Sequence, residues 1–297
     1  MICPHCGGNY TTKNGSYKGK DKERIQRYSC KVCNRSFSVP EYSDVTEKSF
    51  LTTDARADRI LQFKFDDTIR VYGATDIHHG ANEHHWEMFD EFIDTVAKDE
   101  NGYWFINGDA VEFIPPNYHI SQRGQCMEPD EQHLTFIKRI DPIKEKLLFV
   151  RGGNHDMIRS IKLLGFDVAH ILAETMGKPY CKLPGYTKIT ISNRDWYLVS
   201  GHGRSGAKNG DLELTKLAAV YSAGDVFYLG HNHQLYAKPV DSLKPEDNEE
   251  RLHRRWYCRG GSFLKYADYA RYSMFPIIRT GWVVMEFGKD KIRSWTN

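Results

Sequence analysis

The hydrophobic pattern of this 297-residue chain changes near residue 66. Before that point apolar side chains are scarce, and residues 1–38 contain only three Ile, Leu or Val residues. A segment with so little apolar material cannot build a core and needs a metal or disulfide to hold it together. The polar, mixed segment that follows predicts a linker ending in a short helix. The pattern divides the chain into a small domain over residues 1–40, a linker over residues 41–60 and a large domain over residues 61–297.

Beyond residue 66, short apolar runs alternate with helical patterns. Five runs have the length of buried strands, at residues 68–74, 103–107, 146–150, 196–200 and 225–229. Apolar residues recur with helical spacing at residues 83–97, 131–140, 157–176 and 212–221. Four further strands are predicted at residues 234–240, 254–258, 281–287 and 292–295, with the charge-dense segment 241–255 as a solvated loop or hairpin tip. This alternation predicts a layered α/β domain.

Composition and charge add an asymmetry to this division. Hydrophobic residues make up 40% of the chain and charged residues 27%, which is typical of a globular protein and excludes a disordered one. Residues 1–40 carry a net charge of +6, from eight Lys or Arg against two acids, whereas the rest of the chain carries −4. No apolar run is long enough to span a membrane, and the first residues do not resemble a signal peptide. We therefore expect a cytoplasmic protein, with a bacterial or phage-infected cell as its host.

The cysteines indicate a structural zinc ion. Seven cysteines in a chain without an apparent signal peptide favour a reducing compartment, where thiolates bind metal in preference to forming disulfides. Two CxxC pairs separated by 23 residues have the spacing of a zinc site. The predicted zinc ligands are Cys3, Cys6, Cys30 and Cys33. The remaining cysteines are expected to be ordinary core or surface residues; they are Cys126, Cys181 and Cys258.

The segment around the second CxxC pair also resembles a known zinc ribbon. Residues 26–38 read QRYSCKVCNRSFS, and the pattern (Q)RYxCxxCxRxF recurs in the zinc ribbons that begin many transposases. The resemblance implies a contribution to nucleic-acid binding. Independently, a basic segment with interleaved aromatic residues suits phosphate contact combined with base stacking. The candidate nucleic-acid contacts are Lys18, Lys20 and Arg27. The alternative is a ribbon that serves only as a folding unit or as a contact for another protein.

Each of the five apolar runs is followed by a residue whose side chain can bind a metal ion, and a glycine lies close to that residue. The side chains concerned are Asp76 and His78, Asp109 and Glu112, Asn154 and His155, His202, and finally His231 and His233. Ligands bind at the carboxyl ends of strands in open α/β sheets, so these side chains are expected to meet in one pocket. Carboxylate, imidazole and amide ligands without thiolates suit Mn, Fe or Zn. The two Asp, the Asn and four of the His already give seven candidate ligands, which exceed what one catalytic ion needs and favour two adjacent divalent ions.

In order, these motifs resemble the calcineurin-like metallophosphoesterase superfamily. The pattern DxH…GD…GNHD…GH…GHxH spans roughly residues 66–265. The resemblance implies a four-layer α/β/β/α sandwich of two mixed sheets, with Mn²⁺ as the expected ion and Fe or Zn as alternatives. It also implies metal binding by Asp76, His78 and His233 at one ion and by Asn154, His202 and His231 at the other, with Asp109 as the bridge. His155 would be the catalytic histidine and Glu112 its acidic partner.

Other polar residues near the motifs have ordinary explanations. His79, His84 and His85 match no motif position, and the last two are expected to start the following helix. Asp156 is expected to cap a helix. Candidate substrate contacts in polar loops are His119, Arg123, Arg204 and Lys208.

Three functions remain open from the sequence. The favoured one is a nuclease, in which the ribbon delivers DNA or RNA to a two-metal site. The second is a phosphatase for a small molecule, a nucleotide or a phosphoprotein, with the ribbon as a protein-docking module. The third is a DNA-tethered scaffold with a vestigial site, which the complete ligand set disfavours. DNA is the favoured partner, no membrane is expected, and a homodimer is left open.

Overall fold

The computed structural model describes residues 5–6, 10–18, 24–40, 60–115, 124–204, 210–246, 248–266, 277 and 279–297. The chain divides into two compact units, residues 1–59 and residues 60–297. Among the described residues, no helix is long and apolar enough to cross a membrane.

The first unit contains a small antiparallel sheet. Its three strands are β1 (Thr11–Lys18), β2 (Arg24–Cys30) and β3 (Ser36–Pro40), in that order across the sheet. The rings of Tyr28 and Phe37, which face each other on β2 and β3, stack with centroids 5.7 Å apart. Cys30 is buried at the end of β2. A small sheet that carries a cysteine cluster is therefore present in the segment predicted to be a zinc ribbon.

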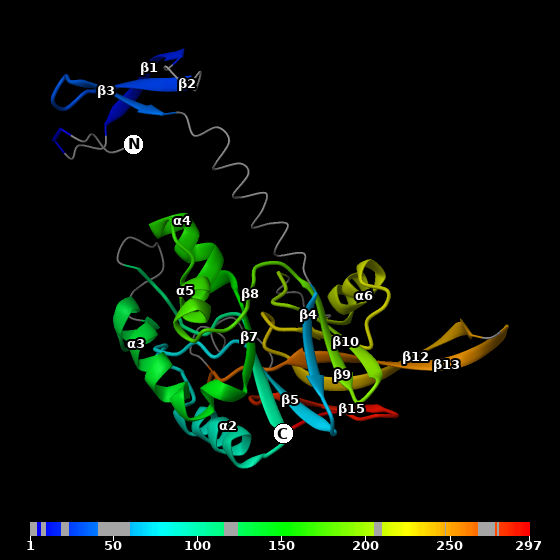
Figure 1. Ribbon diagram of the computed structural model, residues 1–297. Helices are drawn as coiled ribbons and strands as arrows, with labels where there is room; N and C mark the ends of the chain where they lie inside the picture. The colour runs from blue at the N-terminus through cyan, green and yellow to red at the C-terminus, as the bar shows by residue number, and fades with distance from the viewer. Residues whose placement is uncertain are drawn as a thin grey trace. The chain divides into compact units, whose positions relative to one another are not determined.

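The second unit contains two six-stranded mixed sheets (Figure 1). The first has the order β15-β14-β5-β6-β7-β8, and β5, β6, β7 and β8 run parallel. Its strands are β5 (Ile69–Ala74), β6 (Gly102–Asn107), β7 (Leu147–Arg151), β8 (Tyr180–Cys181), β14 (Val283–Phe287) and β15 (Ile292–Thr296).

The second sheet has the order β12-β13-β11-β10-β9-β4, and β10, β11 and β13 run parallel. Its strands are β4 (Leu61–Phe65), β9 (Gly185–Ile191), β10 (Arg194–Gly201), β11 (Val226–Leu229), β12 (Leu235–Glu246) and β13 (Glu249–Gly260).

Apolar residues bury both faces of each sheet, which produces four layers. One core lies between the sheets and includes Phe105, Phe149 and Leu198. A second packs the first sheet against α2 (Trp86–Lys98), α3 (Pro129–Ile140) and α5 (Val168–Thr175), and a third packs the second sheet against α6 (Gly210–Val220). A short 3₁₀ helix, η2 (Asp141–Lys146), leads into β7. The predicted α/β fold with two multi-stranded sheets is confirmed.

One predicted helix differs from the structure, and one predicted loop or hairpin tip is a hairpin. The helix expected over residues 157–176 is three pieces: a π-helical turn η3 (Asn154–Arg159), α4 (Ser160–Leu164) and α5. Gly165 ends α4 with a left-handed φ of 78°, which a glycine adopts without strain. Of the two alternatives for segment 241–255, a solvated loop or a hairpin tip, the structure has the hairpin: the segment is the far end of β12 and β13, which continue pairing from Leu235 with Gly260 to Glu246 with Glu249. Charged side chains are compatible with this long hairpin, because its far end is exposed on both faces.

Candidate metal centre

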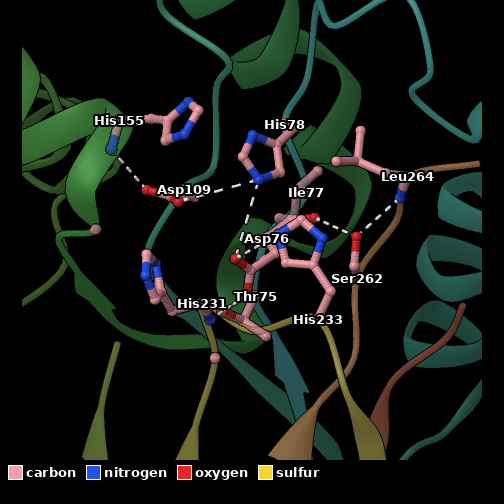
Figure 2. Close-up of polar contacts among 12 residues, drawn as sticks. Thr75, Asp76, Ile77, His78, Asp109, His155, His231, His233, Ser262 and Leu264 are labelled. Carbon is pink, nitrogen blue, oxygen red and sulfur yellow. Dashed lines mark hydrogen bonds and ion pairs between the residues drawn. The ribbon is translucent and has the colours of Figure 1, made fainter. Parts of the chain in front are cut away.

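The carboxyl ends of five strands carry the predicted ligands. Asp76 and His78 follow β5, Asp109 follows β6, and Asn154 begins η3 after β7. His202 follows β10, and both His231 and His233 follow β11. Figure 2 shows the side chains of Asp76, His78, Asp109, His155, His231 and His233 gathered around one region of the second unit. The structure therefore brings together the side chains that the sequence placed at separate strand ends.

Two groups of ligand atoms share this region. Asp76, His78 and His233 form the first group, with ligand atoms all within 4.8 Å of one another. His233 Nε2 lies 3.3 Å and His78 Nε2 lies 3.9 Å from Asp76 Oδ1. Asp109 Oδ2 lies 4.0 Å from His78 Nε2, which places this carboxylate beside the first group.

The second group consists of Asp109, His202 and His231, whose ligand atoms also lie within 4.8 Å of one another. His202 Nε2 is 3.1 Å from Asp109 Oδ2. Asn154 joins this group, because its Oδ1 lies 3.0 Å from His202 Nε2 and 2.8 Å from His231 Nδ1. Asp109 therefore contacts both groups, as a bridging ligand must.

The residues present fit two divalent ions. Among the described residues, the buried atoms Asp76 Oδ1 and His78 Nε2 make no hydrogen bond, which is costly unless another group satisfies them. Atoms bound about 2.1 Å from one ion lie about 3.0–3.4 Å apart, close to several of the separations above. The oxygen and imidazole donors suit Mn, Fe or Zn. We conclude that the site has potential metal-binding groups; they do not determine which metal binds.

The backbone at these ligands is unusual. Asp76, His78, Asp109, His231 and His233 all have φ between 50° and 71°, in the left-handed region that non-glycine residues rarely adopt. Such conformations cost about 1–3 kcal/mol each and cluster at functional sites. Neighbouring glycines allow the close packing: a Cβ at Gly153 would lie 2.1 Å from Asp109 Oδ1. The strained backbone lowers the stability of the fold, and in return it directs these side chains toward the centre.

Charges within the centre keep the carboxylates ionised. Burial raises the pKa of Asp76 and Asp109, but His202 and the other imidazoles lower it by more, so both pKa values lie well below the ordinary value. Burial lowers the pKa of His202, but Asp109 and Asp76 outweigh it and raise this pKa to about 10. The region therefore attracts positive charge, and a metal ion that binds His202 must displace a proton.

Glu112 contacts two histidines of the centre. Its Oε2 lies 2.7 Å from Nδ1 of His78, and its backbone oxygen lies 2.8 Å from Nδ1 of His155. Its Oε1 is farther from His155 Nδ1, at 3.4 Å. Burial raises the pKa of Glu112, but hydrogen bonds from His155 and His78 lower it below its ordinary value. The sequence linked Glu112 to His155 alone, and the structure adds a closer contact with His78.

Residues near the motifs mostly have structural roles. His79 is buried with Nε2 2.9 Å from Thr135 Oγ1, and His84 is buried with Nδ1 2.8 Å from the oxygen of Ile77. His85 is the N-cap of α2, as expected. Asp156 lies in the first turn of η3, where its carboxylate accepts hydrogen bonds from the backbone N–H groups of Gly153 and Ala110.

Of the substrate contacts predicted in polar loops, only Arg204 lies among the described residues. The backbone N–H of Arg204 donates to Glu213 Oε1. Three candidates lie outside the described residues: His119, Arg123 and Lys208.

One residue of the centre was not singled out by the sequence. Arg159 lies four residues after His155, and its Nη2 is 3.1 Å from His155 Nε2. The helical spacing of these two residues was the only local signal that they would meet.

The cysteine group lies in the first unit. Cys6, Cys30 and Cys33 have sulfur atoms within 4.8 Å of one another, and Cys6 Sγ is 3.7 Å from Cys30 Sγ. The fourth predicted ligand, Cys3, lies outside the described residues. Three thiols at this separation are a potential zinc site.

The predicted nucleic-acid contacts of the ribbon are only partly placed. Arg27 is exposed on β2. Lys18 is the last residue of β1, but its side chain lies outside the described part of the structure, as does all of Lys20.

Comparisons with known proteins find solved structures that align with most of this chain at low sequence identity. No family model and no curated protein matches the chain. A predicted phosphoesterase from Streptococcus pneumoniae TIGR4 is 15% identical over 77% of this chain and 98% of that chain, with a TM-score of 0.36. Vacuolar Protein Sorting 29 from Cryptosporidium parvum is 13% identical over 78% and 98%, with a TM-score of 0.40. Zinc-complexed Vps29 from Entamoeba histolytica is 12% identical over 77% and 98%, with a TM-score of 0.38.

Proposed function

We propose that this protein is a two-metal phosphoesterase. The observation that carries the proposal is the pair of adjacent ligand groups with Asp109 in the second and beside the first, in which Asp76 Oδ1 and His78 Nε2 are buried without a hydrogen bond. Two adjacent divalent ions lower the pKa of a bound water and stabilise the negative charge of the phosphate in the transition state. Asp109 would hold both ions, and the remaining ligands would each hold one.

Besides the metal ions, His155 and Glu112 are the protein side chains that would take part in the reaction. His155 lies beside the ligand groups, with a ring nitrogen within 4.8 Å of ligand atoms of His78 and Asp109. An imidazole there can protonate or stabilise the leaving oxygen of a phosphoester. Glu112 contacts the Nδ1 atoms of both histidines and so would orient the proton donor and a metal ligand together.

We further propose that the substrate is a nucleic acid, with DNA favoured. The support comes from the first unit, where residues 1–40 carry a net charge of +6. Tyr28 and Phe37 form an aromatic pair, Tyr10 is 66% exposed and Arg27 is exposed. Positive charge attracts the phosphate backbone, and aromatic rings stack on bases. The ribbon would bind the substrate while the centre cleaves a phosphodiester.

The test compares substrates under one set of metal conditions. Purified protein with added Mn²⁺ should hydrolyse bis-p-nitrophenyl phosphate faster than p-nitrophenyl phosphate, and should cleave labelled DNA or RNA of defined structure. Asp109→Asn should abolish each activity, because a neutral bridge no longer balances two ions. Preference for the monoester without nucleic-acid cleavage would favour the phosphatase with a docking ribbon. Full activity after removal of metal by a chelator would refute the two-metal proposal.

A further inference from the structure

His155 is held at both ring nitrogens. Nδ1 lies 2.8 Å from the backbone oxygen of Glu112, and Nε2 lies 3.1 Å from Nη2 of Arg159. A guanidinium only donates hydrogen bonds, so Nε2 must accept, and the ring hydrogen must be on Nδ1, where the Glu112 oxygen accepts it. The two contacts therefore fix the plane of the imidazole and the nitrogen that carries its hydrogen.

Arg159 is itself fixed by the loop that carries Glu112. Its Nη1 donates to the backbone oxygen of Glu112 at 2.8 Å and to that of Phe113 at 3.1 Å. The side chain is 7% exposed, and its Nη1 lies 3.8 Å from Glu112 Oε1. Burying a guanidinium carries a desolvation cost that an apolar side chain would avoid. Packing alone does not account for an arginine at this position.

We propose that Arg159 is a positioning residue for His155, which rests on the proposed phosphoesterase function. In that hydrolysis one water is consumed: its oxygen bonds to phosphorus, the bond from phosphorus to the leaving oxygen breaks, and one water proton passes first to Nε2 of His155 and then from Nε2 to the leaving oxygen. Arg159 holds the unprotonated Nε2 in place until this nitrogen takes up that proton. Glu112 keeps Nδ1 fixed throughout.

The effect of Arg159 should depend on the leaving group, because it acts through His155. Arg159→Met should lower kcat by roughly 10²-fold for a nucleoside or alkyl leaving group, which needs a proton. The same variant should lose less than about threefold on bis-p-nitrophenyl phosphate, since p-nitrophenolate departs without one. KM should change little in both cases, and Arg159→Lys should recover part of the loss.

The kinetic experiment uses a double-mutant cycle in the full-length, metal-loaded protein. Adding Arg159→Met to His155→Asn should cost less than about twofold, because its target is already absent. The control is Arg254→Met, which removes an exposed arginine that pairs with Asp241 in the hairpin, and it should leave both activities unchanged. Two ions per protein beyond the zinc of the cysteine group in every variant, measured by mass spectrometry, would show that the centre is intact. Loss of ions from Arg159→Met, or equal loss on both esters, would overturn the positioning role.

A second measurement does not depend on activity. In the zinc-loaded protein with ¹⁵N-labelled histidine, the His155 signals, assigned by their absence from His155→Asn, should show a hydrogen on Nδ1 alone. Arg159→Met should add a population with the hydrogen on Nε2. An unchanged ratio would refute the inference even if the enzyme is active. Conversely, absence of hydrolysis in the wild-type protein would refute the proposed function and leave this measurement to decide the positioning role.

Discussion

Glu112 and His78 are joined by a 2.7 Å contact between Oε2 and Nδ1, although 34 residues separate them in the chain. His78 Nε2, the opposite ring nitrogen, is one of the buried atoms that make no hydrogen bond among the described residues. A carboxylate on one nitrogen of a metal-binding histidine fixes its tautomer and makes the other nitrogen a better ligand.

Glu112→Gln should therefore weaken metal binding as well as catalysis. The amide keeps the size of the side chain but loses the charge that orients His78. We expect affinity for the first ion to fall roughly 10–100-fold, measured by calorimetric titration of the metal-free protein. Glu87→Gln, an exposed change at the start of α2, is the control. Unchanged affinity together with lost turnover would assign Glu112 to His155 alone.

His155 and His231 should separate chemistry from metal binding. His155→Ala should keep both ions and lose turnover by roughly 10²–10⁴-fold, the range typical of a general acid. His231→Ala should lose metal as well, because its Nδ1 belongs to the second ligand group. Metal content by mass spectrometry distinguishes the two, and equal metal loss in both variants would contradict the role given to His155.

Glu213 is expected to support the second ion from outside its ligand group. Its Oε1 accepts from the N–H of Arg204 at 2.8 Å, and its Oε2 accepts from the fully buried Arg259 at 3.0 Å. Arg259 also donates to the oxygen of Gly230 at 3.0 Å, so one carboxylate links the loops that carry His202 and His231.

Glu213→Gln should lower the affinity of the second ion by about tenfold and leave the first nearly unchanged. Asp211→Asn is a matched control, because Asp211 lies on the same helix and pairs with Lys238 instead. Two-site fits of calorimetric titrations give both affinities. A loss shared equally by the two ions would indicate general destabilisation.

His84 should make the unfolding free energy depend on pH. Burial, with a smaller contribution from Arg139, lowers the pKa of His84 from 6.5 to about 4. In this pH range His84 binds a proton in the unfolded chain but not in the folded protein. The free energy of unfolding therefore falls as the pH drops from about 6.5 to about 4. The expected loss is on the order of 3 kcal/mol.

Urea unfolding of metal-free protein between pH 4 and 7 measures this slope. His84→Gln should flatten it, and His170→Gln, which changes a half-exposed histidine, should not. His79 keeps part of the slope in either variant, because burial lowers its pKa to about 3. The same slope in wild type and His84→Gln would exclude His84 as its source.

Removing residues 1–40 should separate substrate binding from catalysis. Hydrolysis of a small ester should persist, because none of the seven proposed ligands lies in that segment. Nucleic-acid affinity should fall, and its log–log salt slope should drop by about three to five, since each lost phosphate contact no longer releases counterions. Arg27→Ala should remove about one unit, while Thr12→Ala on the same sheet should remove none. If the truncated protein had the same nucleic-acid affinity and salt slope as the full-length protein, a phosphatase function would be favoured over a nuclease function.

The sequence by itself determined the layered α/β class and the seven candidate ligands. Both follow from local patterns, because apolar runs mark buried strands and ligand residues follow each run directly. Parallel strands then gather their carboxyl ends without further information, which is how Asp76 and Asp109 could be assigned to one centre. For segment 241–255 the charges indicated exposure, but they could not decide between a loop and a hairpin, because pairing across two strands leaves no mark on charge.

Only the tertiary structure decided which side chains meet around those ligands. The contacts of Glu112 with His78 and of Arg259 with Glu213 join residues 34 and 46 positions apart, on parts of the fold whose spacing is set by packing between layers. The left-handed backbone at Asp76 and Asp109 likewise has no local cause, because surrounding contacts must hold a conformation that the residues themselves disfavour. Sequence patterns encode burial and periodicity, whereas the distances that orient His155 arise only when the two sheets and their helices pack together.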